Sequence, residues 1–183
     1  MVRVSASDRV GRTMYKITKY PEPILRRKLK KVDFFRPELQ QISAEMIETM
    51  HGAQGIGIAA NQVGLDMQIA IITDNGREGT EMTIINPEIV NSDGEDLMIE
   101  GCLSFPGVKG GVCRRSWVKI KYQDLEGKPQ ELEADGMLAK CIQHEIDHLN
   151  GMTIYMKMHL VDKSANKNAI RLLQVLYEQR KQQ

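Results

Sequence analysis

The chain has 183 residues, of which 42% are hydrophobic and 27% charged, a balance typical of one soluble globular domain. It has 25 Lys and Arg against 24 Asp and Glu, so the formal net charge of +1 provides no field of one sign for binding a nucleic-acid backbone. Its apolar runs are too short to cross a bilayer, and three cysteines are too few for a disulfide framework. We therefore expect a cytoplasmic protein in a reducing compartment, with no membrane and no sequence-specific nucleic acid as a partner.

The N-terminal part of the chain is expected to be a flexible arm over residues 1–14, which are small, polar and basic and show no hydrophobic periodicity. Residues 15–183 then form a single domain, long enough to bury one core. The first helix is predicted from Pro37, because apolar residues recur at steps of three and four from Leu39 to Met50. Proline is acceptable in a first helical turn, and Gly52 marks the end of this helix.

The middle of the chain predicts strands, since it contains short β-branched segments separated by turn residues. The predicted strands span residues 68–73, 82–86, 112–122 and 130–134, with turns at Asn86–Pro87 and Glu126–Gly127. Helical spacing returns over residues 137–149 and again from Asp162 to the end. The apolar side of this last helix consists of Ile170, Leu173, Leu176 and Tyr177. Strands in a central block with helices before and after predict an α+β fold, in which small antiparallel or mixed β-sheets pack around the helix at 137–149.

The sharpest chemical signal is a pair of histidines, His144 and His148, inside that central helix. At about 100° per residue the two side chains lie within about 40° of each other, one turn apart, so both imidazoles can bind one metal ion. Glu145 beside them can take a proton from bound water. The alternative is a charged helix face with two solvated histidines, but the apolar neighbours Ile142 and Ile146 indicate a helix that enters the core.

A metal site that keeps an open position for water needs a third protein ligand. A zinc peptidase would supply it downstream, and Gly151 does lie at the glycine position of one such motif, but the histidine position is Ile154, which cannot ligate metal. Cys102 is the better candidate, because a thiolate binds a borderline-soft metal well. A single cysteine can also be a buried, inert thiol, and we apply that interpretation to Cys113 and Cys141.

A glycine-rich segment at Gly55–Gln62 allows another backbone to approach closely, and Gln62 adds an amide donor that cannot ionise. It is not a phosphate-binding loop, because it follows a helix and lacks the Lys-Ser/Thr ending. Alone, this segment predicts a tight turn with close packing.

Together these segments resemble the peptide deformylases, whose motifs are G-x-G-x-A-A-x-Q, E-G-C-L-S and Q-H-E-x-D-H. The motifs stand complete and in the same order at Gly55–Gln62, Glu100–Ser104 and Gln143–His148. The resemblance extends from Tyr15 to Met158, and the helical tail is similar to that of the bacterial subclass with a long C-terminal helix. Asn61 occupies a position where proline is common, a difference that should alter the stiffness of the loop more than its chemistry.

The resemblance implies a hydrolase that removes the formyl group from N-formylmethionine at the N-terminus of nascent polypeptides and releases formate. It implies one divalent metal ion per chain, held by Cys102, His144 and His148, with Glu145 as the general base for water. The developing oxyanion would be met by Gln62 and the backbone N–H of Leu103. The residues implied to bind substrate are Gly57 and Gly101, through their backbone groups, and Ile56, Met98, Met137, Cys141 and the stem of Lys140, around the methionine side chain.

Two arguments about the metal differ. One thiolate and two imidazoles suit zinc, whereas the resemblance implies Fe2+ as the native ion, with Ni2+ or Co2+ as working substitutes and Zn2+ often poor. We expect Fe2+, because binding strength and turnover are separate quantities. The implied partners are N-formylmethionyl nascent peptides, and hence transient proximity to the ribosome. The alternative functions are a zincin-type metallopeptidase and a non-catalytic module that binds metal or peptide.

Overall fold

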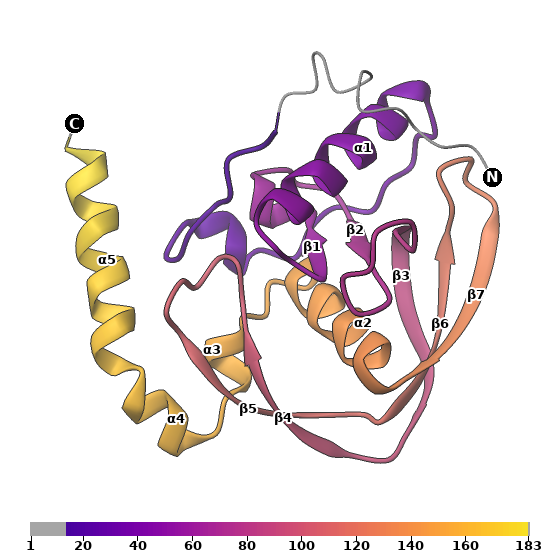
Figure 1. Ribbon diagram of the computed structural model, residues 1–183. Helices are drawn as coiled ribbons and strands as arrows, with labels where there is room; N and C mark the ends of the chain where they lie inside the picture. The colour runs from indigo at the N-terminus through magenta and orange to yellow at the C-terminus, as the bar shows by residue number, and fades with distance from the viewer. Residues whose placement is uncertain (1–13, 183) are drawn as a thin grey trace.

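The computed structural model describes residues 14–182, which form two antiparallel sheets and five α-helices (Figure 1). The strands are β1 (Gly57–Ala59), β2 (Ile69–Ile72), β3 (Met82–Asp93), β4 (Asp96–Gly101), β5 (Lys109–Arg114), β6 (Trp117–Gln123) and β7 (Pro129–Asp135). The helices are α1 (Pro37–Gly52), α2 (Gly136–Leu149), α3 (Ile154–Lys157), α4 (Leu160–Ala165) and α5 (Lys167–Lys181), with 3-10 turns η2 (Pro23–Arg26) and η3 (Ala60–Val63). The predicted α+β fold class is confirmed, and residues 1–13 of the expected arm lie outside the described part of the chain.

The larger sheet has the strand order β1-β2-β3-β6-β7, and the smaller one pairs β4 with β5. Helix α2 lies at the centre, against β1, β2 and β7, while α1 packs on β1 and β2 of the same sheet (Figure 1). The main core between them is fully buried, as Met46 of α1, Ile71 of β2 and Ile142 of α2 illustrate. Each such side chain stabilises the fold by about 1.5–3 kcal/mol. This burial sets the position of α2 against the sheet.

A second, smaller cluster lies away from α2, where α3 and α5 meet the end of β5. Its buried members include Phe105, Val112, Ile154 and Leu173. Helix α5 is attached to the molecule through this cluster alone among the hydrophobic clusters of residues 14–182, and Figure 1 shows it standing at the periphery.

The turn predicted at Asn86–Pro87 is wrong, because β3 continues through both residues as far as Asp93. Asn86 has a positive φ of 51°, and its side chain accepts a hydrogen bond from the Val32 N–H at 2.8 Å. The pairing of β3 with β6 shifts its register between Ile85 and Glu88. A bulge thus accommodates a proline that donates no ladder hydrogen bond, and the strand goes on beyond it.

The single strand predicted over 112–122 is also wrong, since it is divided between β5 and β6, which belong to different sheets. The break falls at Arg115, whose backbone N–H donates to Gln143 Oε1 and whose carbonyl accepts from Gln143 Nε2, each at 2.9 Å. A glutamine on α2 therefore takes both backbone groups that the strand would have used. This contact is tertiary, so no local pattern reports it.

The C-terminal segment forms two helices where the sequence predicts one from Asp162 onward. Asn166 separates α4 from α5, and its side-chain amide donates to the carbonyls of Lys109 and Asp162, each at 2.8 Å. The predicted apolar side is buried except at Leu176, which is 43% exposed.

Strands β1 and β4 have no counterpart in the sequence prediction: β1 has only three residues, and the apolar residues of β4, Leu97–Ile99, are consecutive and do not alternate with polar ones. Cys113 is exposed on β5, so its interpretation as a buried thiol is wrong, whereas Cys141 is buried. No helix in the described part of the chain is both long and apolar enough to cross a membrane.

Candidate active site

Helix α2 carries His144 and His148 on one face, one turn apart, as the sequence predicts. Their rings approach edge to face with centroids 5.0 Å apart. Cys102 follows directly after β4, and its Sγ lies 3.1 Å from His148 Nε2. The ligand atoms of these three residues all lie within 4.8 Å of one another. A central helix and the end of a separate two-stranded sheet thus bring together three side chains that could hold one metal ion.

The chemistry of these donors fits a divalent metal. Burial alone would raise the pKa of Cys102, but the charge of His148 and hydrogen bonds with both histidines hold it well below the ordinary value. The thiolate is the form that binds metal. Burial would lower the pKa of His144, but hydrogen bonds to Cys102 and Glu100 raise it well above the ordinary value, so metal binding would release a proton there. A set of one thiolate and two imidazoles leaves room for a further ligand.

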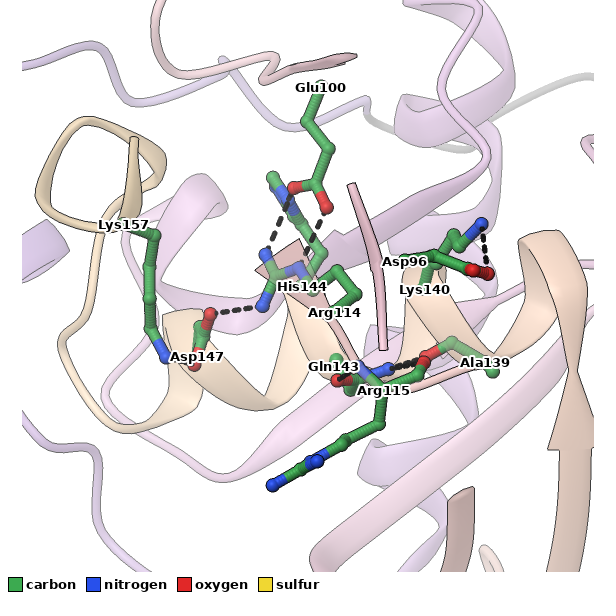
Figure 2. A network of polar contacts seen from close by, with 10 residues as sticks. All are labelled: Asp96, Glu100, Arg114, Arg115, Ala139, Lys140, Gln143, His144, Asp147 and Lys157. Atoms are coloured by element: carbon green, nitrogen blue, oxygen red, sulfur yellow. Dashed lines mark hydrogen bonds and ion pairs between the residues drawn. The ribbon is translucent and has the colours of Figure 1, made fainter. Parts of the chain in front are cut away.

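The outer nitrogen of His144 is held by a buried ion network (Figure 2). His144 Nδ1 lies 2.9 Å from Glu100 Oε2, which leaves Nε2 as its ligand atom. Arg114 bonds the same carboxylate through Nε and Nη2, at 2.7 and 2.9 Å, and reaches Asp147 through Nη1. Burial would raise the pKa of Glu100, but hydrogen bonds from Arg114 and His144 lower it to about 2. A carboxylate partner of this kind fixes the orientation of a ligating imidazole.

Glu145 is 3% exposed and lies beside the three candidate ligands. Burial raises its pKa to about 7, despite the opposing charges of His144 and His148. Its Oε2 is buried and has no hydrogen-bond partner within residues 14–182. A Cβ at Gly57 would lie 2.5 Å from Glu145 Oε1, so only glycine allows β1 to pass this carboxyl group. A carboxyl with this pKa can both accept and return a proton near neutrality.

Two further hydrogen-bond donors, the Gln62 amide and the Leu103 backbone N–H, belong to residues close to the candidate ligands. Gln62, in η3, is 1% exposed; its Oε1 accepts from the Ala59 N–H at 2.8 Å, which turns its NH2 group toward Cys102, with Nε2 3.5 Å from Sγ. The carbonyl of Cys102 accepts from the Phe105 N–H at 3.0 Å. In a trans peptide the N–H points away from the carbonyl, so the Leu103 N–H points out of this turn.

These groups, apart from the buried His148, line a pocket of about 500 Å³. All the residues that the sequence suggests for substrate binding line it: Ile56, Gly57, Met98, Gly101, Met137, Lys140 and Cys141. Lys140, an unusual residue for a pocket wall, is tied by its ammonium to Asp96 Oδ2 at 3.1 Å, as Figure 2 shows. Its aliphatic stem can therefore serve as wall while the charge is paired outside.

Sequence reasoning assigned no role to Arg114, Asp147 or the carboxylate of Glu100. The side chain of Arg114 is 3% exposed, and it joins β5 to both β4 and α2. Glu100 could have been found, because it lies within the E-G-C-L-S motif. Nothing local singles out Arg114, since its partners are 14 and 33 residues away.

Three candidate metal ligands beside a buried carboxyl group, at the wall of a pocket, are the arrangement expected of a metal-dependent hydrolase. Comparison with known proteins identifies the family of hydrolases to which the chain belongs. The model of the polypeptide deformylase family matches residues 14–164, and the chain belongs to this family. It is therefore an enzyme that removes the formyl group from nascent polypeptides, with a divalent metal as cofactor, and not a zincin-type peptidase or a non-catalytic module.

Known peptide deformylases are similar to this protein in sequence and structure along most of the chain. Peptide deformylase from Chromobacterium violaceum is 43% identical over 155 residues, which cover 85% of this chain and 93% of the relative. That from Thermodesulfovibrio yellowstonii is 42% identical over 144 residues, covering 78% and 87%. A crystal structure of peptide deformylase from Plasmodium falciparum has a TM-score of 0.86 at 38% identity and covers 89% of this chain and 97% of its own.

Proposed function

We propose that residues 15–183 act as one domain in which Glu145, Gln62 and the Leu103 N–H hydrolyse the formyl amide, while Cys102, His144 and His148 hold the metal. The observation that carries this proposal is that Glu145, Gln62, Leu103, Cys102 and His144 line one pocket, with a ligand atom of His148 within 4.8 Å of those of Cys102 and His144. The bound metal would supply Lewis acidity, which polarises the formyl carbonyl and makes water more acidic. Proton transfer, stabilisation of the oxyanion and binding of the substrate are carried out by residues of the protein.

Glu145 is the proton acceptor for the attacking water. With a pKa of about 7, it takes a proton as the water attacks the formyl carbon and returns it to the departing amine. The carboxyl is buried, so solvent does not compete for it. The products are formate and a peptide with a free amino terminus.

Gln62 and the Leu103 N–H are the donors to the oxyanion. The amide of Gln62 is already turned toward the site by its bond to Ala59, so it needs no reorganisation when charge develops. The carbonyl of Leu103 accepts a 2.6 Å hydrogen bond from Lys19 Nζ, which steadies the same loop. Preorganised donors of this kind are commonly the largest catalytic contribution.

The substrate lies between two sheet edges. β1 ends the larger sheet and β4 has one partner only, so Gly57 and Gly101 can offer backbone groups to an extended peptide. The methionine side chain fills the apolar part of the pocket, formed by Ile56, Met98 and Met137 with Cys141 and the stem of Lys140. Each buried methylene is worth about 0.8 kcal/mol, so formyl-Met peptides should react more than tenfold faster than formyl-Ala peptides.

The native metal is Fe2+ in this proposal. The supporting arguments are the family relationship and the separation of affinity from turnover; zinc, favoured over ferrous iron by affinity, would bind and turn over slowly. The thiolate of Cys102 beside iron also makes the enzyme sensitive to oxidation. Because its substrates are nascent polypeptides, the enzyme acts in the cytoplasm and transiently near the ribosome in this proposal.

The test is formate release from formyl-Met-Ala, with acetyl-Met-Ala and formyl-Ala-Ala as controls. We expect release from the first substrate, loss of activity with a chelator, and recovery when metal is restored. Cleavage of the Met-Ala bond in place of formate release would overturn the proposal. Turnover per bound ion for iron, nickel and zinc forms of one apo preparation decides the metal, and a zinc form as fast as the others would refute Fe2+.

A further inference from the structure

Asn61 makes a long-range contact with the end of the central helix. It is completely buried in η3, and its Nδ2 donates a 2.7 Å hydrogen bond to the backbone carbonyl of His148, 87 residues along the chain. This carbonyl lies in the last turn of α2, where it also accepts a 3.1 Å hydrogen bond from the Gly151 N–H just beyond the helix. The side chain thus joins the glycine-rich segment to the helix that carries two of the proposed ligands.

The residue after Asn61 is Gln62, which points into the pocket. Gln62 is held by Ala59 on one side and approaches Cys102 on the other. The two consecutive side chains therefore link η3 to His148 and to Cys102. Any shift of η3 relative to α2 would displace the proposed oxyanion donor with respect to two of the proposed ligands.

The two histidines differ in how their outer nitrogens are held. His144 Nδ1 has the carboxylate of Glu100 as its partner, whereas His148 Nδ1 is buried without a hydrogen-bond partner within residues 14–182. The Oδ1 of Asn61 is likewise buried and unpaired within the same residues. His148 thus lacks, within the described residues, the carboxylate support that His144 has, and the bond from Asn61 is a side-chain constraint on its backbone that reaches it from another segment.

We propose that Asn61 is a positioning residue, which sets the place of His148 relative to Cys102 and Gln62 through its bond to the His148 carbonyl. The inference rests on the proposed ligand set. It assigns to this asparagine a role in the geometry of the metal centre, beyond the loop stiffness expected from the sequence.

The test uses protein loaded with Co2+, whose visible bands report the thiolate and imidazole ligands directly. The variant is Asn61→Leu, which keeps approximately the volume and removes the hydrogen bond. Asn150→Ala is the matched control: Asn150 Nδ2 donates to the Ile146 carbonyl at 2.9 Å in the same helical turn, but Asn150 is exposed and does not reach η3. Asn61→Ala provides a second variant if the leucine prevents folding, as judged by circular dichroism.

We expect Asn61→Leu to shift the Co2+ bands, to release Co2+ to a chelator about tenfold faster, and to lower kcat about tenfold with little change in KM, the size typical of lost support around a ligand. The control should keep the parent values. Unchanged bands and release in both Asn61 variants would overturn the inference, as would an equal change in Asn150→Ala. If the parent itself showed no thiolate-to-cobalt band, the ligand set of the proposed function would fail instead.

Discussion

Helices α2 and α5 are nearly equal in length, yet they differ strongly in the fraction of their residues that is buried. Eight of the 14 residues of α2 are buried, among them the polar Gln143, Glu145 and His148. Only three of the 15 residues of α5 are buried, and all three are hydrophobic or aromatic. The difference follows from their surroundings: strands of the larger sheet pack against α2, whereas α5 touches one small cluster at the edge (Figure 1).

This contrast shows what deep burial demands of a polar helix. Buried polar groups need partners, and three polar residues of α2 obtain them from distant segments: Gln143 from the Arg115 backbone, His144 from Glu100, and Asp147 from Arg114. Glu145 Oε2 and His148 Nδ1 have no such partner within residues 14–182. Helix α5 buries no charged or amide side chain, and the hydroxyl of its Tyr177 finds a partner, Lys181, on the same helix. Substitutions of the residues that bind the polar groups of α2 should therefore lower stability or activity strongly, whereas substitutions on the outer face of α5 should have little effect.

The largest effect on stability is expected for Arg114→Met, which leaves the carboxylates of Glu100 and Asp147 without their buried partner. Removing one member of a buried ion network costs about 3–5 kcal/mol of unfolding free energy. Urea denaturation of the chelator-treated proteins measures this loss. The control is Arg115→Met, the exposed neighbour, which should stay within about 0.5 kcal/mol. Equal losses for the two variants would show that the network does not stabilise the fold.

Glu145→Gln should abolish most of the activity while keeping the fold. The amide is nearly isosteric but cannot accept a proton, so kcat should fall by at least ~100-fold with metal content near one ion per chain. On α5 the same change at the exposed Glu178 should leave kcat as it is. Formate release and metal analysis check both variants, and near-parental turnover of a metal-loaded Glu145→Gln protein would remove Glu145 from the mechanism.

Gln62→Leu extends the comparison to the segment that faces α2. Loss of one oxyanion donor costs roughly 3 kcal/mol in the transition state, so kcat should fall about a hundredfold at unchanged metal content. Steady-state kinetics with formyl-Met-Ala measures kcat and KM separately. A rise in KM alone would make Gln62 a binder of the ground state.

The smallest effects belong to α5, where two leucines form an internal comparison. Leu173 is 7% exposed within the small cluster, and Leu173→Ala should cost about 2 kcal/mol, near the lower end for a buried leucine. Leu176 is 43% exposed, and Leu176→Ala should change stability by less than about 0.5 kcal/mol. Thermal unfolding of both proteins tests the pair; a larger loss at Leu176 would indicate that its outer face is covered in solution.

The sequence predicted much of the secondary structure that depends on local patterns. Helices α1 and α2 were recognisable from their apolar spacing, and the β6–β7 hairpin from the turn at Glu126–Gly127. Two of the failures come from a long-range hydrogen bond of one side chain. Gln143 divides the strand predicted over 112–122, and Asn166 separates α4 from α5. In both cases the partner is distant in the sequence, so the local pattern does not report the contact.

For the site, the sequence determined which residue types could do the chemistry and how the two histidines are spaced, because helical geometry fixes the relation between His144 and His148. It could not determine that Cys102 reaches them, since that depends on how the β4–β5 sheet docks beside α2. The pKa values of Cys102 and Glu145, the support of His144 by Glu100 and Arg114, and the contact from Asn61 to His148 were likewise decided by tertiary structure. The physical reason is that burial and long-range hydrogen bonds act through space, and only the folded chain brings these groups within reach of one another.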